Sequence, residues 1–323
     1  MEPGGGVDPL GHRILALISQ RWVVAILLEL ADGPLRPHEL ERRLPALSHA
    51  GLMRRLRELS QSGAVRHRRS RDIPPRAHYA LTRSGEELLT IVDRAARWED
   101  QAGTLASSVP GAKALRLVAD QRTLAIVGGL ALEPSGPREL GRRILPTGHA
   151  ALMRRLVALS REGLVVRHQR DGEVIYEPTA TARGLAALAI LAMGWERARD
   201  GDERDPPPSD LLGMIRLIAP LAAPPVELHG ACHLSVQGAN EREAGLWLLA
   251  GGGTLSVIGD APPMRLALAR APLDTWLRTL LTGPPSAIVT IADPVLTAGV
   301  VGALAALLRT RRLDSLFDLL KIA

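Results

Sequence analysis

Two stretches of this sequence repeat each other at an interval of 100 residues. Residues 48–63 read SHAGLMRRLRELSQSG, and residues 148–163 read GHAALMRRLVALSREG. In the first copy Leu52, Leu56 and Leu59 fall at i, i+4 and i+7, which makes one side of a helix apolar. Arginines occupy the other side. The chain is therefore expected to contain two short amphipathic helices, each of which buries leucines and exposes a basic face.

The residues before the first copy predict a helix-turn-helix. Residues 36–44 form a short helix with proline near its first turn, where proline is tolerated, and residues 45–47 connect it tightly to the repeated helix. Ser48 is a suitable N-cap for the second helix, and Gly63 is a suitable C-terminal stop. A helix of this kind, with basic residues outward, suits the major groove of DNA.

The residues after the first copy predict a hairpin. Residues 64–69 and 77–81 are strand-like, and the turn between them contains Pro74 and Pro75, which cannot continue a central sheet. A basic hairpin behind a recognition helix is a wing that reaches phosphates or the minor groove. Tyr176, Thr179 and Trp195 match Tyr79, Thr82 and Trp98 in order and spacing, which indicates a tandem duplication of the whole unit. Both tryptophans are expected in the core.

Composition sets the domain plan. The chain has 323 residues, enough for two or three domains. We expect a tail at residues 1–9, winged-helix domains at 10–104 and 105–200, a charged and proline-rich linker at 201–208, and a third domain at 209–323. Strand-like and helical segments mix irregularly in the third domain, which predicts an α+β fold. The basic excess of the chain, +6, lies in the two repeats, as is typical of a polyanion-binding protein.

The first repeat resembles the HxlR-type winged-helix transcriptional regulators. The resemblance covers about residues 10–100 and rests on Arg21-Trp22, His38-Glu39-Leu40, Leu47-Ser48 and the wing Ile73–Gly85. It implies binding to palindromic operators, usually as a homodimer, so the two repeats would act as a covalent pseudo-dimer. Many relatives sense oxidants through an N-terminal cysteine, which neither repeat contains. The second repeat departs from the pattern, because Arg122 replaces Trp22 and the wing turns at Asp171-Gly172.

Residues 210–310 resemble a sterol-carrier-protein (type 2) domain. The resemblance rests on Gly253–Val257, Met264–Leu268 and the Leu273–Gly283 helix, and it implies a hydrophobic tunnel for an apolar molecule. The full fold expectation is α+β, with two tandem winged helix-turn-helix domains followed by a sterol-carrier-like ligand-binding domain. The residues expected to line the ligand cavity, or alternatively to fill a core, are Trp247, Leu249, Met264, Leu266, Trp276 and Leu280.

The DNA-contact candidates are the polar residues expected on the two helices and hairpins. They are Ser48, His49, Arg54, Arg55, Arg57, Arg66, Arg68, Arg69, Arg71 and Arg76 in the first repeat, and His149, Arg154, Arg155, Arg167 and Arg170 in the second. The alternative is a solvated basic face, and Arg55 flanks the leucine stripe, where its stem packs. Val157 replaces Arg57, so the second repeat is either a weaker DNA contact or a degenerate dimerisation domain.

Other functional classes find little support. His229, Cys232 and His233 lie in a strand-like run without a second ligand cluster, so no metal site and no cofactor are expected. No nucleophile-and-base constellation indicates an enzyme. The N-terminus lacks a signal-peptide pattern, and the longest apolar run, 295–308, is too short to span a bilayer, so we expect a cytoplasmic protein without membrane contact.

The sequence thus predicts a bacterial regulator whose partners are double-stranded DNA and an apolar small-molecule effector, with further homodimerisation left open. The alternative function is sequestration of a hydrophobic metabolite, with the winged helices serving as an interaction scaffold. Binding to DNA in a gel-shift experiment distinguishes the two.

Overall fold

The structure is a computed structural model that describes residues 12–69, 77–103, 109–144, 148–170, 172–200, 208–238, 243–260, 262, 264, 266–282 and 288–309. These residues divide into two compact units. The first unit is His12–Ala119, and the second unit contains the described residues from Asp120 onward.

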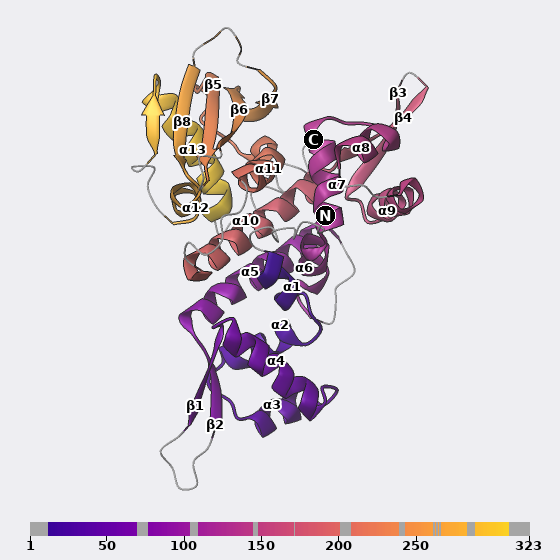
Figure 1. Ribbon diagram of the computed structural model, residues 1–323, viewed down its shortest axis with the longest axis vertical. Coiled ribbons are helices and arrows are strands. Elements are labelled where there is room, and N and C mark those ends of the chain that lie inside the picture. Colours follow the sequence, from indigo (N-terminus) through magenta and orange to yellow (C-terminus); the bar gives the residue numbers. More distant parts are fainter. Residues whose placement is uncertain are drawn as a thin grey trace, which may run out of the picture. The chain divides into compact units, whose positions relative to one another are not determined.

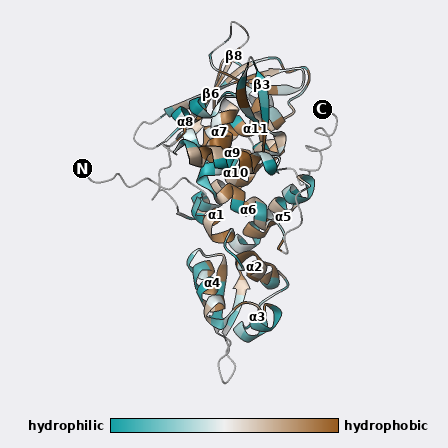
Figure 2. Cartoon of the chain, turned by 90° about the vertical axis from the view of Figure 1, so that its right-hand side faces the viewer, coloured by the Kyte–Doolittle hydropathy of each residue, from teal (hydrophilic) through white to brown (hydrophobic). Residues whose placement is uncertain are grey.

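The first unit combines helices with one antiparallel hairpin (Figure 1). Its elements are α1 (His12–Ile18), α2 (Val23–Ala31), α3 (Pro37–Arg43), α4 (His49–Gln61), β1 (Val65–Arg69), β2 (Ala77–Leu81), α5 (Arg83–Gln101) and α6 (Ala112–Ala119). Its core consists of Leu, Ile and Val side chains from α1, α2, α4 and α5. Helix α2 is brown for most of its length in Figure 2, while α4 and α5 show both colours, as amphipathic helices do.

Helix α6 joins the first unit, although its sequence begins the second repeat. It packs against both α1 and α5. The Glu99 carboxylate of α5, which is 4% exposed, accepts the backbone N–H groups of Gly111, Lys113 and Ala114 at 3.1, 2.5 and 2.8 Å. These are the otherwise unsatisfied donors at the start of α6. The compact first unit therefore ends at Ala119 and not at residue 104, the domain boundary predicted from the sequence.

The N-terminal part of the second unit has the same order of elements as the first unit after α1. It contains α7 (Gln121–Leu132), α8 (Pro137–Arg143), α9 (His149–Arg161), β3 (Val165–Arg170), β4 (Glu173–Pro178) and α10 (Ala180–Asp200). Trp98 on α5 and Trp195 on α10 are both buried, as the sequence predicts. Helix α10 packs on α11 (Pro208–Ile218), which is followed by the short 3-10 helix η2 (Ala219–Leu221).

A five-stranded sheet forms the rest of the second unit. Its strands are β5 (Gly230–Gln237), β6 (Glu243–Gly251), β7 (Thr254–Ile258), β8 (Leu266–Pro272) and β9 (Val289–Ile291). They lie in the order β7-β6-β5-β8-β9, and β5 pairs with β8 in parallel while the other neighbours are antiparallel. Helices α12 (Leu273–Leu281) and α13 (Pro294–Arg309) pack on each other and on β5 and β8. Mixed helix and sheet is the class that the sequence predicts.

Alternation along the strands gives this sheet two unlike faces. Cys232, Leu234 and Val236 point to the helix-covered face, where the Cys232 thiol bonds Thr297 of α13, and all three are fully buried. His233 points to the opposite face, where its ring meets Trp247 with centroids 4.7 Å apart. Cys232 and His233 therefore cannot share one metal ion.

The six residues expected to line a ligand cavity do not gather at one place. Trp247 and Leu249 alternate with buried Leu246 and Leu248 along β6, so they lie on the half-exposed face together with Leu266 of β8. Trp276 and Leu280 are fully buried in α12, where the Trp276 indole N–H donates to the Ser235 carbonyl at 2.8 Å. Met264 lies in the segment before β8 and is 47% exposed. The spacing of these residues did not show which face of the sheet each would take.

Among the described helices, none has by itself the length and apolar character of a membrane span. Helices α1 and α2 meet the requirement only as a pair, and a bend of 81° separates them.

Candidate nucleic-acid interface

Helices α3 and α4 form the expected helix-turn-helix, and local capping fixes both starts. Pro37 opens α3, and the Glu39 carboxylate accepts the Arg36 backbone N–H at 2.6 Å, a hydrogen bond that lowers the pKa of Glu39. The Ser48 hydroxyl accepts the Gly51 backbone N–H at 3.2 Å at the start of α4. Ser48 is thus the N-cap that the sequence predicts.

Helix α4 has the predicted two-sided character. Leu52, Leu56 and Leu59 are each 0% exposed, so the leucine stripe fastens the helix to the core. Arg54 and Arg57 are exposed, and neither forms an ion pair with any residue that the structure describes. Free guanidinium groups on the outer face of an anchored helix are available to phosphates and to the acceptor edges of guanine.

Two of the predicted contact residues instead have partners within the fold. The Arg55 side chain is 16% exposed and bonds Gln20 and the Glu58 carboxylate, which lies 2.6 Å away. Arg55 therefore ties α4 to the segment before α2 and is not part of the exposed basic face. His49 is exposed at the first turn of α4, but its Nδ1 lies 2.5 Å from a carboxylate oxygen of Glu41 on α3. This contact links the two helices of the motif, and the helical periodicity of the sequence does not predict it.

The hairpin after α4 presents further basic residues. Arg66 and Arg68 are exposed on β1, and His67 pairs across the hairpin with Tyr79, with ring centroids 4.9 Å apart. The Thr82 hydroxyl donates to the Gly63 carbonyl at 2.7 Å, which connects the end of α4 to the end of the hairpin. Arg69 belongs to β1, but its side chain, Arg71 and Arg76 lie outside the described residues, so their predicted DNA contact stays a prediction.

Helix α9 and its hairpin copy this arrangement with fewer cations. Residues 148–160 have the same burial at every position as residues 48–60. Arg154, Arg167 and Arg170 are exposed, and so is His149, which has no carboxylate like Glu41 beside it because Gly141 occupies that position. Arg155 bonds Asp120 and Thr123, so it is a structural residue like Arg55.

Two exposed valines mark the difference between the copies. Val157 is 41% exposed and Val166 is 42% exposed, and they occupy the positions of Arg57 and Arg66. Both arginine-to-valine exchanges are visible in the sequence when the two copies are aligned at their 100-residue interval.

A helix-turn-helix whose second helix is basic on its outer face, followed by a basic antiparallel hairpin, defines the winged-helix class of DNA-binding proteins. Residues 17–106 match the family described as HxlR-like helix-turn-helix. The chain belongs to this family through its first winged helix. Its homologues there are HTH-type transcriptional regulators.

Individual relatives match the same quarter of the chain. An uncharacterized HTH-type transcriptional regulator of Methanothermobacter thermautotrophicus is 36% identical over 87 residues, which cover 27% of this chain and 66% of that protein, just under two thirds of its length. The HTH-type transcriptional regulator YvaP of Bacillus subtilis, also uncharacterized, is 34% identical over 28% of this chain and 83% of its own length. The reduced form of the transcriptional regulator YodB from B. subtilis is a solved structure with 31% identity, covering 28% of this chain and 87% of that one, at a TM-score of 0.27.

Proposed function

We propose that this chain is a one-component transcription regulator in which two winged helices of one polypeptide replace the two subunits of a homodimer. The first winged helix reads sequence through α4 and its hairpin. The second positions the protein through α9, whose outer face carries fewer cations. The C-terminal sheet domain senses an apolar small molecule.

The observation that carries the pseudo-dimer is the pairing of α1 with α6. These helices occupy equivalent places in the two repeats, 100 residues apart, and they pack on each other. Contact between equivalent elements is the mark of an isologous, two-fold interface between subunits. In this chain the interface forms within one polypeptide, and the Glu99 carboxylate holds the start of α6 against it.

DNA binding is tested with the full-length chain on two duplexes of equal length, one from upstream of its own gene and one of scrambled sequence. We expect one chain per duplex by light scattering, protection of two adjacent half-sites, and a steep fall in affinity with salt. Two chains per duplex, or protection of one half-site only, would contradict the pseudo-dimer. Failure to shift either duplex at low salt would favour the sequestration alternative.

The assignment of α4 is tested with Arg54→Ala combined with Arg57→Ala. Each phosphate contact contributes about 0.9 to the slope of log affinity against log salt, so losing two lowers the slope by roughly 1.8 and the affinity by tens-fold at about 0.1 M salt. Arg116→Ala combined with Arg278→Ala is the matched control, because both arginines are exposed and lie on α6 and α12. Equal losses of DNA affinity in the two double variants would show that DNA binding depends on the net charge of the protein and not on α4.

The half-exposed sheet face supports the sensor proposal. Trp247, Leu249 and Leu266 form its apolar centre, and Ile291, 53% exposed, extends it along β9. Apolar surface of this kind is typical of ligand or partner sites. A fatty acid or a polycyclic fluorophore is expected to quench Trp247, and Trp247→Ala is expected to abolish saturable binding without changing DNA affinity. Binding that survives this substitution would place the ligand elsewhere.

A further inference from the structure

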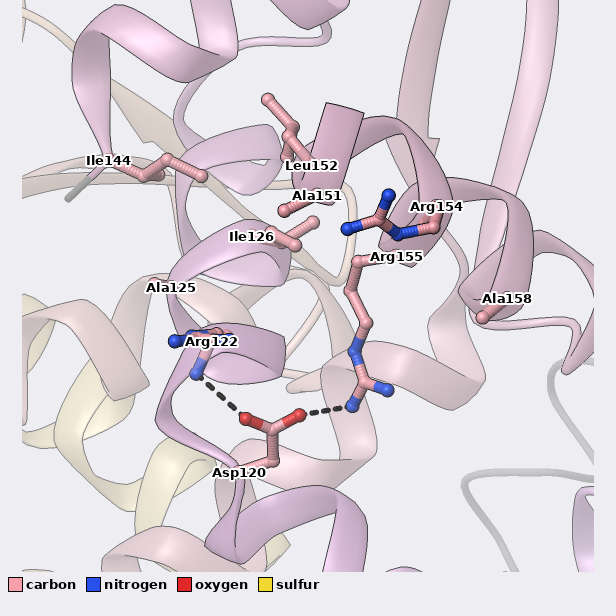
Figure 3. A pocket seen from close by; sticks show the side chains of 10 residues that line it. All are labelled: Asp120, Arg122, Ala125, Ile126, Ile144, Ala151, Leu152, Arg154, Arg155 and Ala158. Carbon is pink, nitrogen blue, oxygen red and sulfur yellow. Dashed lines mark hydrogen bonds and ion pairs between the residues drawn. The ribbon is translucent and has the colours of Figure 1, made fainter. Parts of the chain in front are cut away.

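A cavity of about 660 Å³ opens between α7 and the first turns of α9, within the second unit. Figure 3 shows its wall, to which both helices contribute side chains. Its lining residues are Asp120, Arg122, Ala125, Ile126, Ile144, Ala151, Leu152, Arg154, Arg155 and Ala158. The volume lies within the range of small-molecule sites in proteins, roughly 300–1,000 Å³.

The charges around this cavity do not balance. Asp120 is the one carboxylate in the lining, and it is already engaged, because it bonds the Arg155 guanidinium and accepts the Arg122 backbone N–H at 3.1 Å. The guanidinium groups of Arg122 and Arg154 form no ion pair with any residue in the described part of the chain. The buried Nε of Arg155 also finds no acceptor there. Two guanidinium groups without a carboxylate partner among the described residues, those of Arg122 and Arg154, thus border a cavity whose one lining carboxylate is engaged.

The remaining lining is apolar. Ala125 and Ile126 come from α7, Ile144 follows α8, and Ala151 and Leu152 come from α9. A bare inorganic anion would leave this surface wet. A ligand with a carboxylate at one end and a branched or aromatic hydrocarbon body at the other satisfies both parts of the lining, since Arg binds carboxylates through paired hydrogen bonds.

Comparison of the two repeats shows how the cavity arises. Trp22, which stacks under Arg21 at 4.9 Å, occupies the position of Arg122 in the first repeat. Glu58, which holds Arg55, occupies the position of Ala158. The second repeat has therefore exchanged an indole ring for a guanidinium, and the carboxylate that pairs with Arg55 or its counterpart has moved from the Glu58 position to Asp120, which replaces Gln20. The lining thereby gains one positive charge.

We propose that this cavity is a binding site for a small organic carboxylate, held by Arg122 and Arg154 over the apolar floor of α7 and α9. The site differs in place and in ligand chemistry from the sheet face of the C-terminal domain. Its regulatory consequence rests on the proposed function: Arg154 also lies on the outer face of α9, so a bound carboxylate neutralises a cation that would otherwise meet a phosphate. Ligand and DNA then compete for α9.

The test is calorimetric titration of the full-length chain with benzoate and 4-methylpentanoate, and with the matching neutral amides and inorganic phosphate as comparisons. We expect saturable binding of at least one carboxylate and at least tenfold weaker binding of its amide. Arg122→Ala combined with Arg154→Ala is expected to weaken carboxylate binding at least tenfold, whereas Arg54→Ala, the matched change in the first repeat, leaves it unchanged.

A second variant restores the residues of the first repeat. Arg122→Trp combined with Ala158→Glu is expected to abolish carboxylate binding while the thermal unfolding midpoint stays within a few degrees of the parent. Equal binding of amide and carboxylate, equal binding of phosphate, or carboxylate binding that survives both double variants would each overturn the proposal. None of these measurements involves DNA, so they test the carboxylate site independently of the proposed regulator function.

Discussion

Removal of the Glu99 carboxylate should loosen α6 from the first unit. The carboxylate is buried and accepts three backbone N–H groups at the start of α6, from Gly111, Lys113 and Ala114. An N-cap substitution alone costs about 0.5–2 kcal/mol, and each buried backbone donor left unsatisfied costs about 1–3 kcal/mol, so the loss of three such hydrogen bonds is expected to cost about 3–5 kcal/mol. We expect Glu99→Ala to lower the free energy of unfolding of the His12–Ala119 unit by an amount in this range.

The Gln variant separates charge from shape. One Glu99 oxygen accepts hydrogen bonds from the backbone N–H groups of Lys113 and Ala114, and the other accepts one from the backbone N–H of Gly111. Glu99→Gln keeps the first oxygen but places an NH₂ group against the Gly111 N–H, so about 1–3 kcal/mol should be lost. Glu87→Ala is the control on the same helix, because Glu87 is exposed and its one ion pair within the described part of the chain is with Arg83 at 3.6 Å, a contact worth about 0.5 kcal/mol or less.

Urea unfolding gives the free energies, and hydrogen exchange of the full-length chain locates the effect. The amides of residues 111–119 should exchange faster in Glu99→Ala, while those of α4 keep their protection. If Glu99→Ala costs less than about 1 kcal/mol and these amides exchange at the parent rate, then Glu99 does not hold α6, and the pairing of α1 with α6 loses its main support.

Three further predictions follow from single features. Val157→Arg combined with Val166→Arg should tighten DNA binding and steepen the salt slope by roughly 1.8, and an unchanged slope would mean that α9 does not face DNA. Burial raises the pKa of the Cys232 thiol to about 12, so native protein should resist iodoacetamide at pH 8 and react only after unfolding; rapid native labelling would refute this. Burial raises the pKa of Asp210 to about 6, so the native carboxylate holds its proton longer than the unfolded one and stability falls as pH rises from about 4 to 6. Asp210→Asn should therefore gain about 1–2 kcal/mol at pH 7.5, after allowance for partial exposure, and nothing near pH 4; an equal gain at both pH values would refute the reasoning.

Features that depend only on residues close together in the sequence could be predicted from the sequence alone. The leucine stripe of α4, its Ser48 N-cap and the proline start of α3 each depend on residues close together in the sequence. The structure confirms all three.

Contacts between residues far apart in the sequence could not be predicted, because they depend on partners that no local pattern identifies. Whether Arg55 points outward or to Gln20 depends on a partner 35 residues away. The register of β6 against β5, in which Trp247 lies opposite His233, sets which face of the sheet Trp247 takes, and strand alternation alone leaves that choice open. The attachment of α6 to α1 joins segments about 100 residues apart, and no local sequence pattern predicts it.

If the two unequal winged helices act as the proposed pseudo-dimer, the response of a gene to the concentration of the regulator changes. A regulator that must first dimerise occupies its site in proportion to the square of its concentration at low levels, whereas a chain with both readers built in responds linearly. Because α4 and α9 differ, with Arg57 in one and Val157 in the other, such a chain also has a polarity. It would sit on its operator in one direction only, and that operator need not be a palindrome.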